Sequence, residues 1–252
     1  MSDGTRGTAL VTGAARRIGL GIATALARAG FDVALHASPA SLDEARAVAA
    51  DLAGRTGRRT AALAADLADP DAAATLVDAA AAAFGGLTLL VNSASVFEPD
   101  TALDPAWLDR HLAVNLAAPL RLAAAFARLE AEGRDRSIVH ILDQRVLRPL
   151  PDFHSYAVSK AALWEATRTG ALALAPRGVR VNAVAPGPVL PNRFDGPDGF
   201  RREAAGVPLG RGVTVDEIAA AVLYFATARS VTGQILAVDG GQHLSPPREP
   251  CP

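Results

Sequence analysis

The sequence predicts an α/β fold: one doubly wound parallel sheet of about seven strands with helices on both faces. The chain alternates short, β-branched apolar runs with longer segments of helical periodicity over nearly its whole length. Such alternation is typical of parallel sheets whose strands are joined by single helices. No internal repeat or linker interrupts it, so residues 1–244 are predicted to form one domain, followed by a short tail.

The expected elements follow one another in strict alternation. Runs rich in apolar residues predict strands at 8–13, 31–38, 59–67, 87–95, 137–143, 179–186 and 234–241. Apolar residues at helical spacing predict helices at 18–29, 41–53, 70–84, 104–132, 154–175 and 215–228. Ser41 followed by Glu44 predicts an N-cap for the second helix, and Pro70 fits the first turn of the third.

The longest segment without a predicted helix or strand is 187–213, which is rich in Gly, Pro and charged residues. Loops of this length within one domain are often lids or binding loops, so we expect it to border the substrate. The tail, 245–252, is expected to be unstructured or packed on a neighbouring subunit.

The bulk composition argues against several classes of partner. With a formal net charge of −1, the chain lacks the basic excess that binds nucleic acid or an anionic membrane. Its longest apolar runs are alanine-rich and broken by charges, and its first residues include no apolar segment of the signal-peptide type. The one cysteine, Cys251, cannot form an internal disulfide. We therefore expect a cytoplasmic protein.

A glycine turn, TGAARRIG at 12–19, follows the first predicted strand and opens the first helix. This is where a Rossmann-type sheet binds a dinucleotide, because the free N–H groups of the helix attract a pyrophosphate. Two arginines here would repel the positive end of the helix dipole unless an anion were bound, although they could simply be solvated. The candidate cofactor residues at this turn are Gly13, Arg16, Arg17, Ile18 and Gly19.

The end of the second predicted strand bears on the choice between NAD and NADP. It reads LHAS at 35–38, with no Asp or Glu to bind the ribose hydroxyls of NAD. A 2′-phosphate would not be repelled there, and Arg16, Arg17, His36 and Ser38 could all donate hydrogen bonds to it. The sequence therefore favours NADPH.

Tyr156 and Lys160 are distinctive in a chain with two tyrosines and one lysine among 25 Lys and Arg residues. They lie four residues apart on a predicted helix and so share a face. A phenol of ordinary pKa, about 10, exchanges protons poorly at neutral pH, whereas a neighbouring ammonium lowers that pKa. Such a tyrosine becomes a usable acid, and Arg would not replace the compact ammonium. An ordinary surface pair is the alternative.

Seven stretches together resemble the short-chain dehydrogenase/reductase family over roughly residues 7–244. They are TGAARRIG, Asp66-Leu67, VNSAS at 91–95, Asn115 in HLAVNLAAP, YAVSK at 156–160, VRVNAVAPGPV at 179–189 and VTGQILAVDGG at 231–241. The resemblance implies that Tyr156 is the proton donor, that Lys160 binds the nicotinamide ribose and tunes Tyr156, and that Asn115 supports a water-linked proton relay. It also implies a homotetramer built through the helices at 104–132 and 154–175.

The same resemblance implies the remaining cofactor contacts. Asp66 and Leu67 would flank the adenine, and Pro186 and Gly187 would border the nicotinamide. The residues expected to line the cofactor groove are Asn92, Ala94 and Ser95.

Position 143 departs from the family pattern, which has a serine there to donate a hydrogen bond to a carbonyl oxygen. This chain has Asp143, and no Ser or Thr lies between Ile138 and Phe153. An ionised carboxylate would repel the charge that develops on a carbonyl oxygen, whereas a C=N nitrogen must gain a proton, which an acid pair can supply. Asp143 therefore favours a nitrogen heterocycle, unless it is protonated or merely ends the strand.

This pattern resembles the pteridine reductase branch of the family, which includes bacterial dihydromonapterin and dihydrofolate reductases. The matching features are Arg16-Arg17, His36, Ser93-Ala94-Ser95 with Phe97, and Asp143. Phe97 would stack on a flat pterin, or it could simply be a packing residue. The branch often has a basic residue after the second strand, where this chain has Ser38-Pro39.

We therefore expect an NADPH-dependent reductase of a C=N bond in a small pterin-like substrate, with no metal. The expected catalytic residues are Asn115, Asp143, Tyr156 and Lys160, with Phe97, Asp143 and Tyr156 at the substrate. One alternative is a carbonyl reductase or alcohol dehydrogenase acting on a small ketone or 3-oxoacyl substrate. Another is a non-catalytic NADP(H)-binding sensor.

Overall fold

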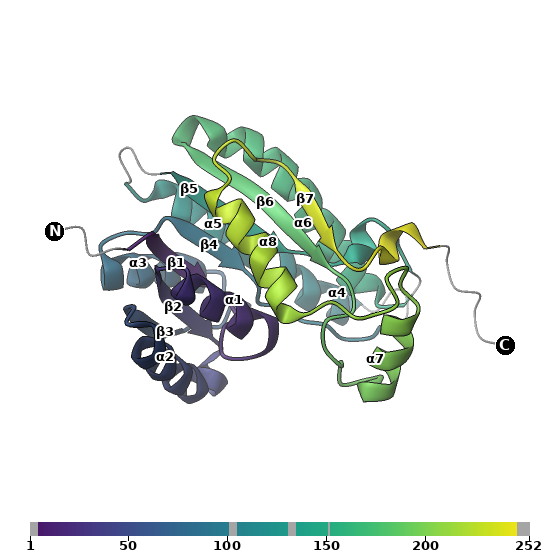
Figure 1. Ribbon diagram of the computed structural model, residues 1–252. Helices are drawn as coiled ribbons and strands as arrows, with labels where there is room; N and C mark the ends of the chain where they lie inside the picture. Colours follow the sequence, from purple (N-terminus) through teal and green to yellow (C-terminus); the bar gives the residue numbers. More distant parts are fainter. Residues whose placement is uncertain (1–4, 101–104, 131–134, 151, 246–252) are drawn as a thin grey trace.

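Seven parallel strands, in the order β3-β2-β1-β4-β5-β6-β7, form the sheet at the centre of the molecule (Figure 1). The computed structural model describes residues 5–100, 105–130, 135–150 and 152–245. The strand order and the helices on both faces confirm the predicted doubly wound fold.

The elements lie close to their predicted positions, and most predicted strands are a few residues too long. The strands are β1 (Gly7–Val11), β2 (Phe31–Ala37), β3 (Thr60–Ala64), β4 (Leu89–Asn92), β5 (Arg136–Ile141), β6 (Val179–Pro186) and β7 (Ile235–Val238). The α-helices are α1 (Arg17–Arg28), α2 (Leu42–Thr56), α3 (Ala72–Phe84), α4 (Pro105–Leu112), α5 (Ala118–Arg128), α6 (His154–Leu174), α7 (Gly196–Ala205) and α8 (Val215–Thr227). Shorter helical turns are η1 (Pro39–Ser41), η2 (Ala113–Ala117), η3 (Gln144–Val146), η4 (Ala175–Arg177) and η5 (Gln242–Leu244).

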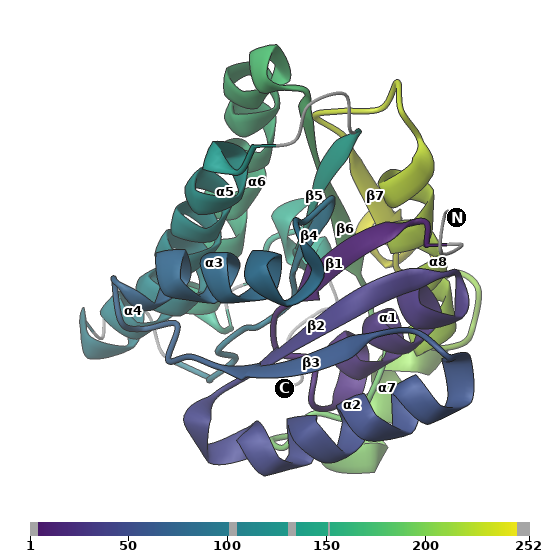
Figure 2. The same ribbon diagram turned by 90° about the vertical axis from the view of Figure 1, so that its left-hand side faces the viewer.

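Two helical layers enclose the sheet: α1, α2 and α8 pack on one face, and α3, α5 and α6 pack on the other (Figure 2). Successive strand residues point to opposite layers, so that Ala9 and Val11 of β1 join the first cluster while Leu10 joins the second. Because both faces are covered, the central strands are continuously apolar. In the described part of the chain, no helix has the length and hydrophobicity needed to cross a membrane.

The winding of the chain reverses between β1 and β4, which are neighbours in the middle of the sheet. The carboxyl ends of parallel strands diverge at such a point and leave a crevice for ligands. The glycine turn follows β1, and the turn containing Ala94 and Ser95 follows β4. The fold therefore brings two of the predicted cofactor segments to the same edge of the sheet.

The helix predicted over 104–132 is interrupted. In the described residues it consists of α4, the wider π-helical turn η2 and α5, while residues 104 and 131–132 lie outside them. The π turn contains Asn115. Its side chain accepts a hydrogen bond from the Val96 N–H and donates one to the Val96 carbonyl oxygen. Such turns often occur at functional sites, and helical periodicity alone does not reveal them.

The predicted irregular segment 187–213 contains a helix, α7, so the expectation of a structureless loop was wrong. Its sequence, GPDGFRREAA, contains two glycines and a proline, which obscured the helical pattern. Pro197 nevertheless fits the first turn of a helix, where its missing N–H costs nothing. Of the predicted tail, only Ser245 lies within the described residues.

The predicted side-chain cap at Ser41 was also wrong. Ser41 ends the turn η1 and makes no capping bond to α2. Its hydroxyl instead accepts a hydrogen bond from Arg16, on the glycine turn. A complete capping box stands elsewhere, at Thr214 and Glu217 of α8.

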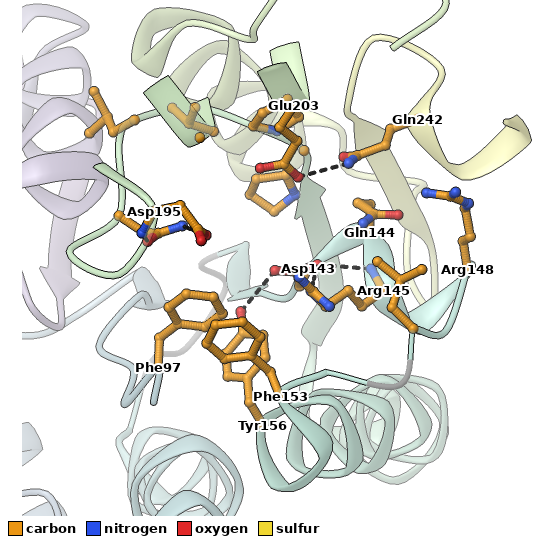
Figure 3. Close-up of a pocket in the computed structure, with 18 of the residues that line it drawn as sticks. Phe97, Asp143, Gln144, Arg145, Arg148, Phe153, Tyr156, Asp195, Glu203 and Gln242 are labelled. Atoms are coloured by element: carbon orange, nitrogen blue, oxygen red, sulfur yellow. Dashed lines mark hydrogen bonds and ion pairs between the residues drawn. The ribbon is translucent and has the colours of Figure 1, made fainter. Parts of the chain in front are cut away.

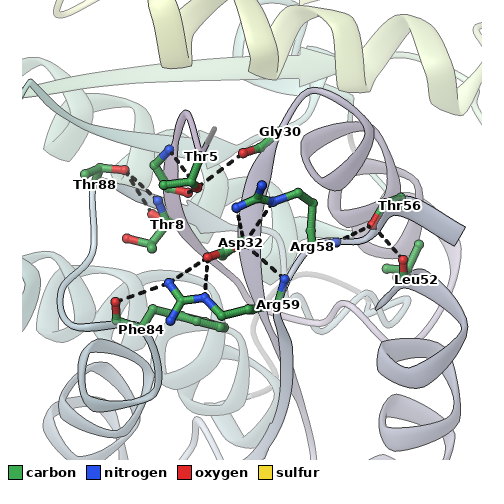
Figure 4. Close-up of polar contacts among 11 residues, drawn as sticks. Thr5, Thr8, Gly30, Asp32, Leu52, Thr56, Arg58, Arg59, Phe84 and Thr88 are labelled. Carbon is green, nitrogen blue, oxygen red and sulfur yellow. Dashed lines mark hydrogen bonds and ion pairs between the residues drawn. The ribbon is translucent and has the colours of Figure 1, made fainter. Parts of the chain in front are cut away.

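A buried carboxylate joins β2 to the start of β3. Asp32 has no exposed surface and accepts hydrogen bonds from Arg58 Nε at 3.0 Å and from Arg59 Nε at 2.7 Å (Figure 4). The backbone N–H of Arg59 also donates to it, at 3.0 Å. Burial raises the pKa of Asp32, but the hydrogen bonds from Arg59 and Arg58 outweigh it and hold the pKa below its usual value.

Replacing Asp32 by Ala should lower the free energy of unfolding by about 3 kcal/mol, because it removes the buried acceptor of the hydrogen bonds from Arg58 and Arg59. The contribution of the carboxylate is present above its ordinary pKa of 3.8 and is lost as the pH falls below that value. Urea unfolding at pH 7 measures the loss. Asp51→Ala, which removes an exposed pair with Arg55, should change stability little. Equal losses in the two variants would contradict the prediction.

Candidate active site

Two adjoining cavities open at the carboxyl edge of the sheet. The first, of about 610 Å³, lies over the glycine turn and the ends of β2 and β4. The second, of about 520 Å³, contains Asp143, Tyr156 and Phe97. Arg17 and Ile18 line both cavities and so form the boundary between them.

The first cavity is bordered by most of the predicted cofactor residues. They are Gly13, Arg16, Arg17, Ile18, Gly19, His36, Ser38, Asp66, Leu67, Ala94 and Ser95. A Cβ atom on Gly13 would lie 2.9 Å from Ala94 Cα, and one on Gly19 would lie 2.2 Å from the Gly13 carbonyl oxygen. Both glycines therefore keep the turn tight, so that its backbone forms a cradle of the kind that fits a dinucleotide.

Arg17 stands where the short-chain dehydrogenase/reductase resemblance implies the middle glycine of this turn. Its φ of 54° lies in the left-handed region that glycine adopts without strain. The side chain extends to the segment after β6, where Nη2 donates to the Pro191 carbonyl oxygen at 3.0 Å. The turn thus keeps the backbone shape of the glycine version while adding a guanidinium between the two cavities.

His36 does not have the role predicted for it as a donor to a 2′-phosphate. It is buried, its Nδ1 accepts from the Gly13 N–H at 3.2 Å, and its Nε2 donates to the Ala65 carbonyl oxygen at 3.1 Å. Burial lowers its pKa, so the ring is neutral near pH 7. Both ring nitrogens are engaged, and His36 instead holds the glycine turn against the end of β3.

Arg16 supplies the basic group that the sequence lacks directly after β2. Its guanidinium donates to Ser41 Oγ at 2.5 Å and lies 3.1 Å from Glu44 Oε2. These contacts bring a positive charge to η1, which begins next to Ser38. The spacing of Ser41 and Glu44 indicates a helix cap, and no sequence pattern indicates the polar cluster that they form with Arg16.

In the second cavity, Tyr156 and Asp143 form a direct hydrogen bond (Figure 3). The Tyr156 hydroxyl donates to Asp143 Oδ2 at 3.0 Å, and the Arg145 backbone N–H donates to Asp143 Oδ1 at 2.8 Å. Asp143 follows β5, and Tyr156 lies in the first turn of α6. The residue that departs from the family pattern is therefore bonded directly to the tyrosine predicted to be the proton donor.

The pKa of Tyr156 differs from the expectation that Lys160 would lower it. Burial and the negative charge of Asp143 raise this pKa well above 10, and the charge of Arg145 opposes them only in part. Near neutral pH the side chain is a protonated phenol. A phenolate beside an ionised Asp143 would place two negative charges in contact.

Lys160 lies beneath this pair. It is buried, its Nζ donates to the Ile141 carbonyl oxygen at 2.8 Å, and it lies 5.6 Å from the centre of the Tyr156 ring. Burial lowers the pKa of Lys160 to about 8, although the charge of Asp143 works against the shift. The single lysine of the chain thus connects α6 to β5, two residues before Asp143.

Asn115 connects the turn after β4 to α6 but makes no bond to Tyr156 Oη or Lys160 Nζ among the described contacts. Its Oδ1 accepts from the Val96 N–H at 2.8 Å, and its Nδ2 donates to the Val96 carbonyl oxygen at 2.9 Å. Nδ2 also donates to Ser159 Oγ at 3.1 Å. The geometry shows how Asn115 positions the two segments.

Three phenylalanines form an aromatic wall beside Tyr156. Phe97 stacks on Phe153 with ring centres 4.3 Å apart and planes within 7°, and its ring meets that of Tyr156 edge-on at 4.8 Å. Phe194 packs against both phenylalanines. Phe153 was missed from the sequence, although it lies only three residues before Tyr156.

The remaining predicted residues are divided between the cavity and the core. Pro186 and Gly187 line the second cavity, whereas Asn92 lines neither. Asn92 is buried, and its Nδ2 lies 3.1 Å from His140 Nδ1. Burial lowers the pKa of His140 to about 3, so this pair is neutral and supports the sheet beneath the site.

Comparison with known proteins places this geometry in a family. A family model described as enoyl-(acyl carrier protein) reductase matches residues 13–243. The chain belongs to the short-chain dehydrogenase/reductase family. It is therefore an oxidoreductase, and the predicted family resemblance is confirmed.

Several members of the family are similar over almost the whole chain. The structure of FolM alternative dihydrofolate reductase 1 from Brucella canis, complexed with NADP, is 45% identical, covers 97% of both chains and superposes with a TM-score of 0.91. Pteridine reductase 1 of Leishmania tarentolae is 34% identical over 96% of this chain and 98% of its own. Galactitol 2-dehydrogenase of Agrobacterium fabrum is also 34% identical, over 94% of this chain and 97% of its own.

The single lysine permits a direct test of the site's electrostatics. Protein carrying lysine labelled at Cε with an NMR-active isotope should give one side-chain signal that titrates near pH 8, because burial lowers the pKa of Lys160. In Asp143→Asn the midpoint should fall further, since the carboxylate charge that raises this pKa is gone. A midpoint near 10.5, or one unaffected by Asp143→Asn, would contradict the arrangement.

Proposed function

We propose that the protein is an NADPH-dependent reductase of a C=N bond in a pterin-like heterocycle of the dihydropteridine or dihydrofolate class. The observation that carries the proposal is the hydrogen bond from Tyr156 to Asp143, at 3.0 Å. A carboxylate at this position opposes reduction of a ketone, because the carbonyl oxygen gains negative charge during the reaction. The names of the two similar reductases support the same substrate class.

The residues around the first cavity suit a phosphorylated dinucleotide. The turn at Gly13 and Gly19 would hold the pyrophosphate, Asp66 and Leu67 would border the adenine, and Arg16 would bind the 2′-phosphate together with Ser38. The similar structure from Brucella canis, which is complexed with NADP, supports this choice. When bound, the reduced nicotinamide would supply the hydride.

The charges around the pair indicate how the proton is delivered. Transfer of the Tyr156 proton beside an ionised Asp143 would leave a phenolate and a carboxylate 3.0 Å apart. The Lys160 ammonium, 5.6 Å from the centre of the Tyr156 ring, would offset part of this negative charge. We propose that Tyr156, aided by Lys160, Asn115 and Asp143, protonates the ring nitrogen while the hydride is added to the carbon.

The aromatic wall would bind the flat ring. Phe97 and Phe153 present parallel planes next to Tyr156, and a heterocycle packed along them would lie within reach of the acid pair. Phe97 would then be the principal apolar contact.

The proposal includes the assembly and location expected from the sequence, a cytoplasmic homotetramer. Leu120 on α5 and Val158 and Leu172 on α6 are exposed apolar side chains, and they support contact with other copies through these helices.

Turnover of a dihydropterin by the purified protein tests the proposed function. We expect oxidation of NADPH with a dihydropterin or dihydrofolate, and slower oxidation of NADH, because Arg16 would favour the 2′-phosphate. Small ketones, 3-oxoacyl thioesters and sugar alcohols are assayed in parallel by the change in cofactor absorbance. Turnover of one of these compounds, with none of any pterin, would favour the carbonyl reductase or alcohol dehydrogenase reading.

Asp143→Ser should lower kcat/KM for the dihydropterin by roughly a hundredfold, the low end of what a positioned acid or base contributes. The same change should raise the activity towards a ketone, because serine donates a hydrogen bond where the carboxylate repels charge. Asp152→Ser is the matched control, since Asp152 also contacts Arg145 but is not bonded to Tyr156. An equal loss in both variants would trace the effect to Arg145 and not to proton transfer.

A further inference from the structure

Arg145 lies at the junction of two parts of the second cavity, the hydrogen-bonded Tyr156 and Asp143 on one side and the aromatic wall on the other. Its side chain lines the cavity and is 12% exposed. The residue belongs to the turn η3, and Figure 3 shows it beside Asp143. The proton transfer proposed for Tyr156 does not involve the Arg145 side chain.

The guanidinium of Arg145 packs on the aromatic wall. Its Cζ atom lies over the Phe153 ring, 5.2 Å from the ring centre. Phe153 is buried, and its ring also stacks on Phe97, so it contacts a cation and a second aromatic ring at once. A cation is attracted to the face of an aromatic ring, and the attraction is stronger where water is excluded. Arg145 therefore helps to fix the Phe153 ring in place.

Arg145 also contacts two carboxylates. Its backbone N–H donates to Asp143 Oδ1 at 2.8 Å, and its Nε lies 4.0 Å from the same oxygen. At the other end of the side chain, Nη1 donates to Asp152 Oδ1 at 2.8 Å. Asp152 directly precedes Phe153 and is more than half exposed, so this ion pair contributes little by itself. Together these contacts attach the start of α6 to the turn that follows β5.

The backbone of Phe153 requires such an attachment. Its φ of 57° and ψ of 48° lie in the left-handed region, which is unfavourable for a residue with a Cβ atom. Conformations of this kind persist only where the surroundings hold them, and they are concentrated at functional sites. Phe153 occupies the N-cap position of α6, three residues before Tyr156. Its ring is held there by contacts with Phe97, Phe194 and Arg145.

We propose that Arg145 is a positioning residue for the substrate ring, because it holds Phe153, and through it Phe97, in a fixed place relative to Tyr156. The inference rests on the proposed function, in which the heterocycle packs along Phe97 and Phe153. Arg145 then acts on the substrate through the aromatic wall. Loss of its side chain weakens binding of the ring more than it slows proton transfer, since the backbone N–H that bonds Asp143 remains.

The test measures kcat and KM for a dihydropterin in the wild type, Arg145→Met, Phe153→Leu and the double variant. Arg145→Met keeps an unbranched apolar stem and removes the guanidinium. KM should therefore rise about threefold to tenfold, the effect of one partly desolvated cation–aromatic contact, and kcat should change less. Once residue 153 is leucine, Arg145→Met should raise KM no further, because both changes act through the same ring.

Arg46→Met is the control, since it removes an exposed arginine paired with Asp43 on α2, and it should leave KM unchanged. NADPH binding, followed by fluorescence, shows whether each variant is folded, because Arg145 does not line the first cavity. If Arg145→Met fails this check, Arg145→Lys carries the test. Lysine keeps the charge near the carboxylates but lacks the flat group that packs on a ring, so KM should again rise.

An unchanged KM in the folded variants, or a loss confined to kcat, would overturn the inference. Increases in KM that simply add in the double variant would do the same, because they would show that Arg145 does not act through Phe153. Turnover of no pterin by the wild type would instead remove the proposed function, and this inference with it.

Discussion

The hydrogen bond between the phenol of Tyr156 and the carboxylate of Asp143, at the end of β5, is the contact on which the charges and the geometry of the second cavity depend. It requires Asp143 to leave the sheet next to the first turn of α6, and Lys160 maintains that arrangement from below through its bond to the Ile141 carbonyl oxygen. The same lysine side chain therefore links the helix that carries Tyr156 to the strand that precedes Asp143.

Charged and apolar side chains lie on different sides of this hydrogen bond. The glycine turn and Arg16 make a cationic cradle on one side, and the stacked phenylalanines make a flat wall on the other. The neutral pair of Asn92 and His140 lies beneath, where burial excludes a charge on the imidazole ring. Charge is thus concentrated at Arg17, Asp143 and Lys160, close to where a reaction would take place.

Short-range patterns predicted the fold well, because alternation, glycine turns and i,i+4 spacing are local properties of a sequence, and most of the predicted site residues lie around the two cavities. The failures came from long-range contacts. The sequence suggests His36 as a donor to a phosphate, but its Nδ1 accepts a hydrogen bond from the Gly13 N–H of the glycine turn. The sequence suggests Ser41 as a helix cap, but its hydroxyl accepts a hydrogen bond from Arg16, which precedes β2 in the chain. The pKa of Tyr156 depends on Asp143, 13 residues away, more than on the lysine in the next helical turn.

Arg17 is a wall of both cavities and is held by the Pro191 carbonyl oxygen, in the segment that leads to α7. A ligand that drew this guanidinium into one cavity would change the wall of the other. The two binding free energies would then be linked, and the linkage would be reciprocal: a change in the affinity of the second ligand caused by the first is matched by an equal change in the affinity of the first caused by the second. A left-handed arginine thus makes one side chain a shared wall, through which ligands in the two cavities could influence each other.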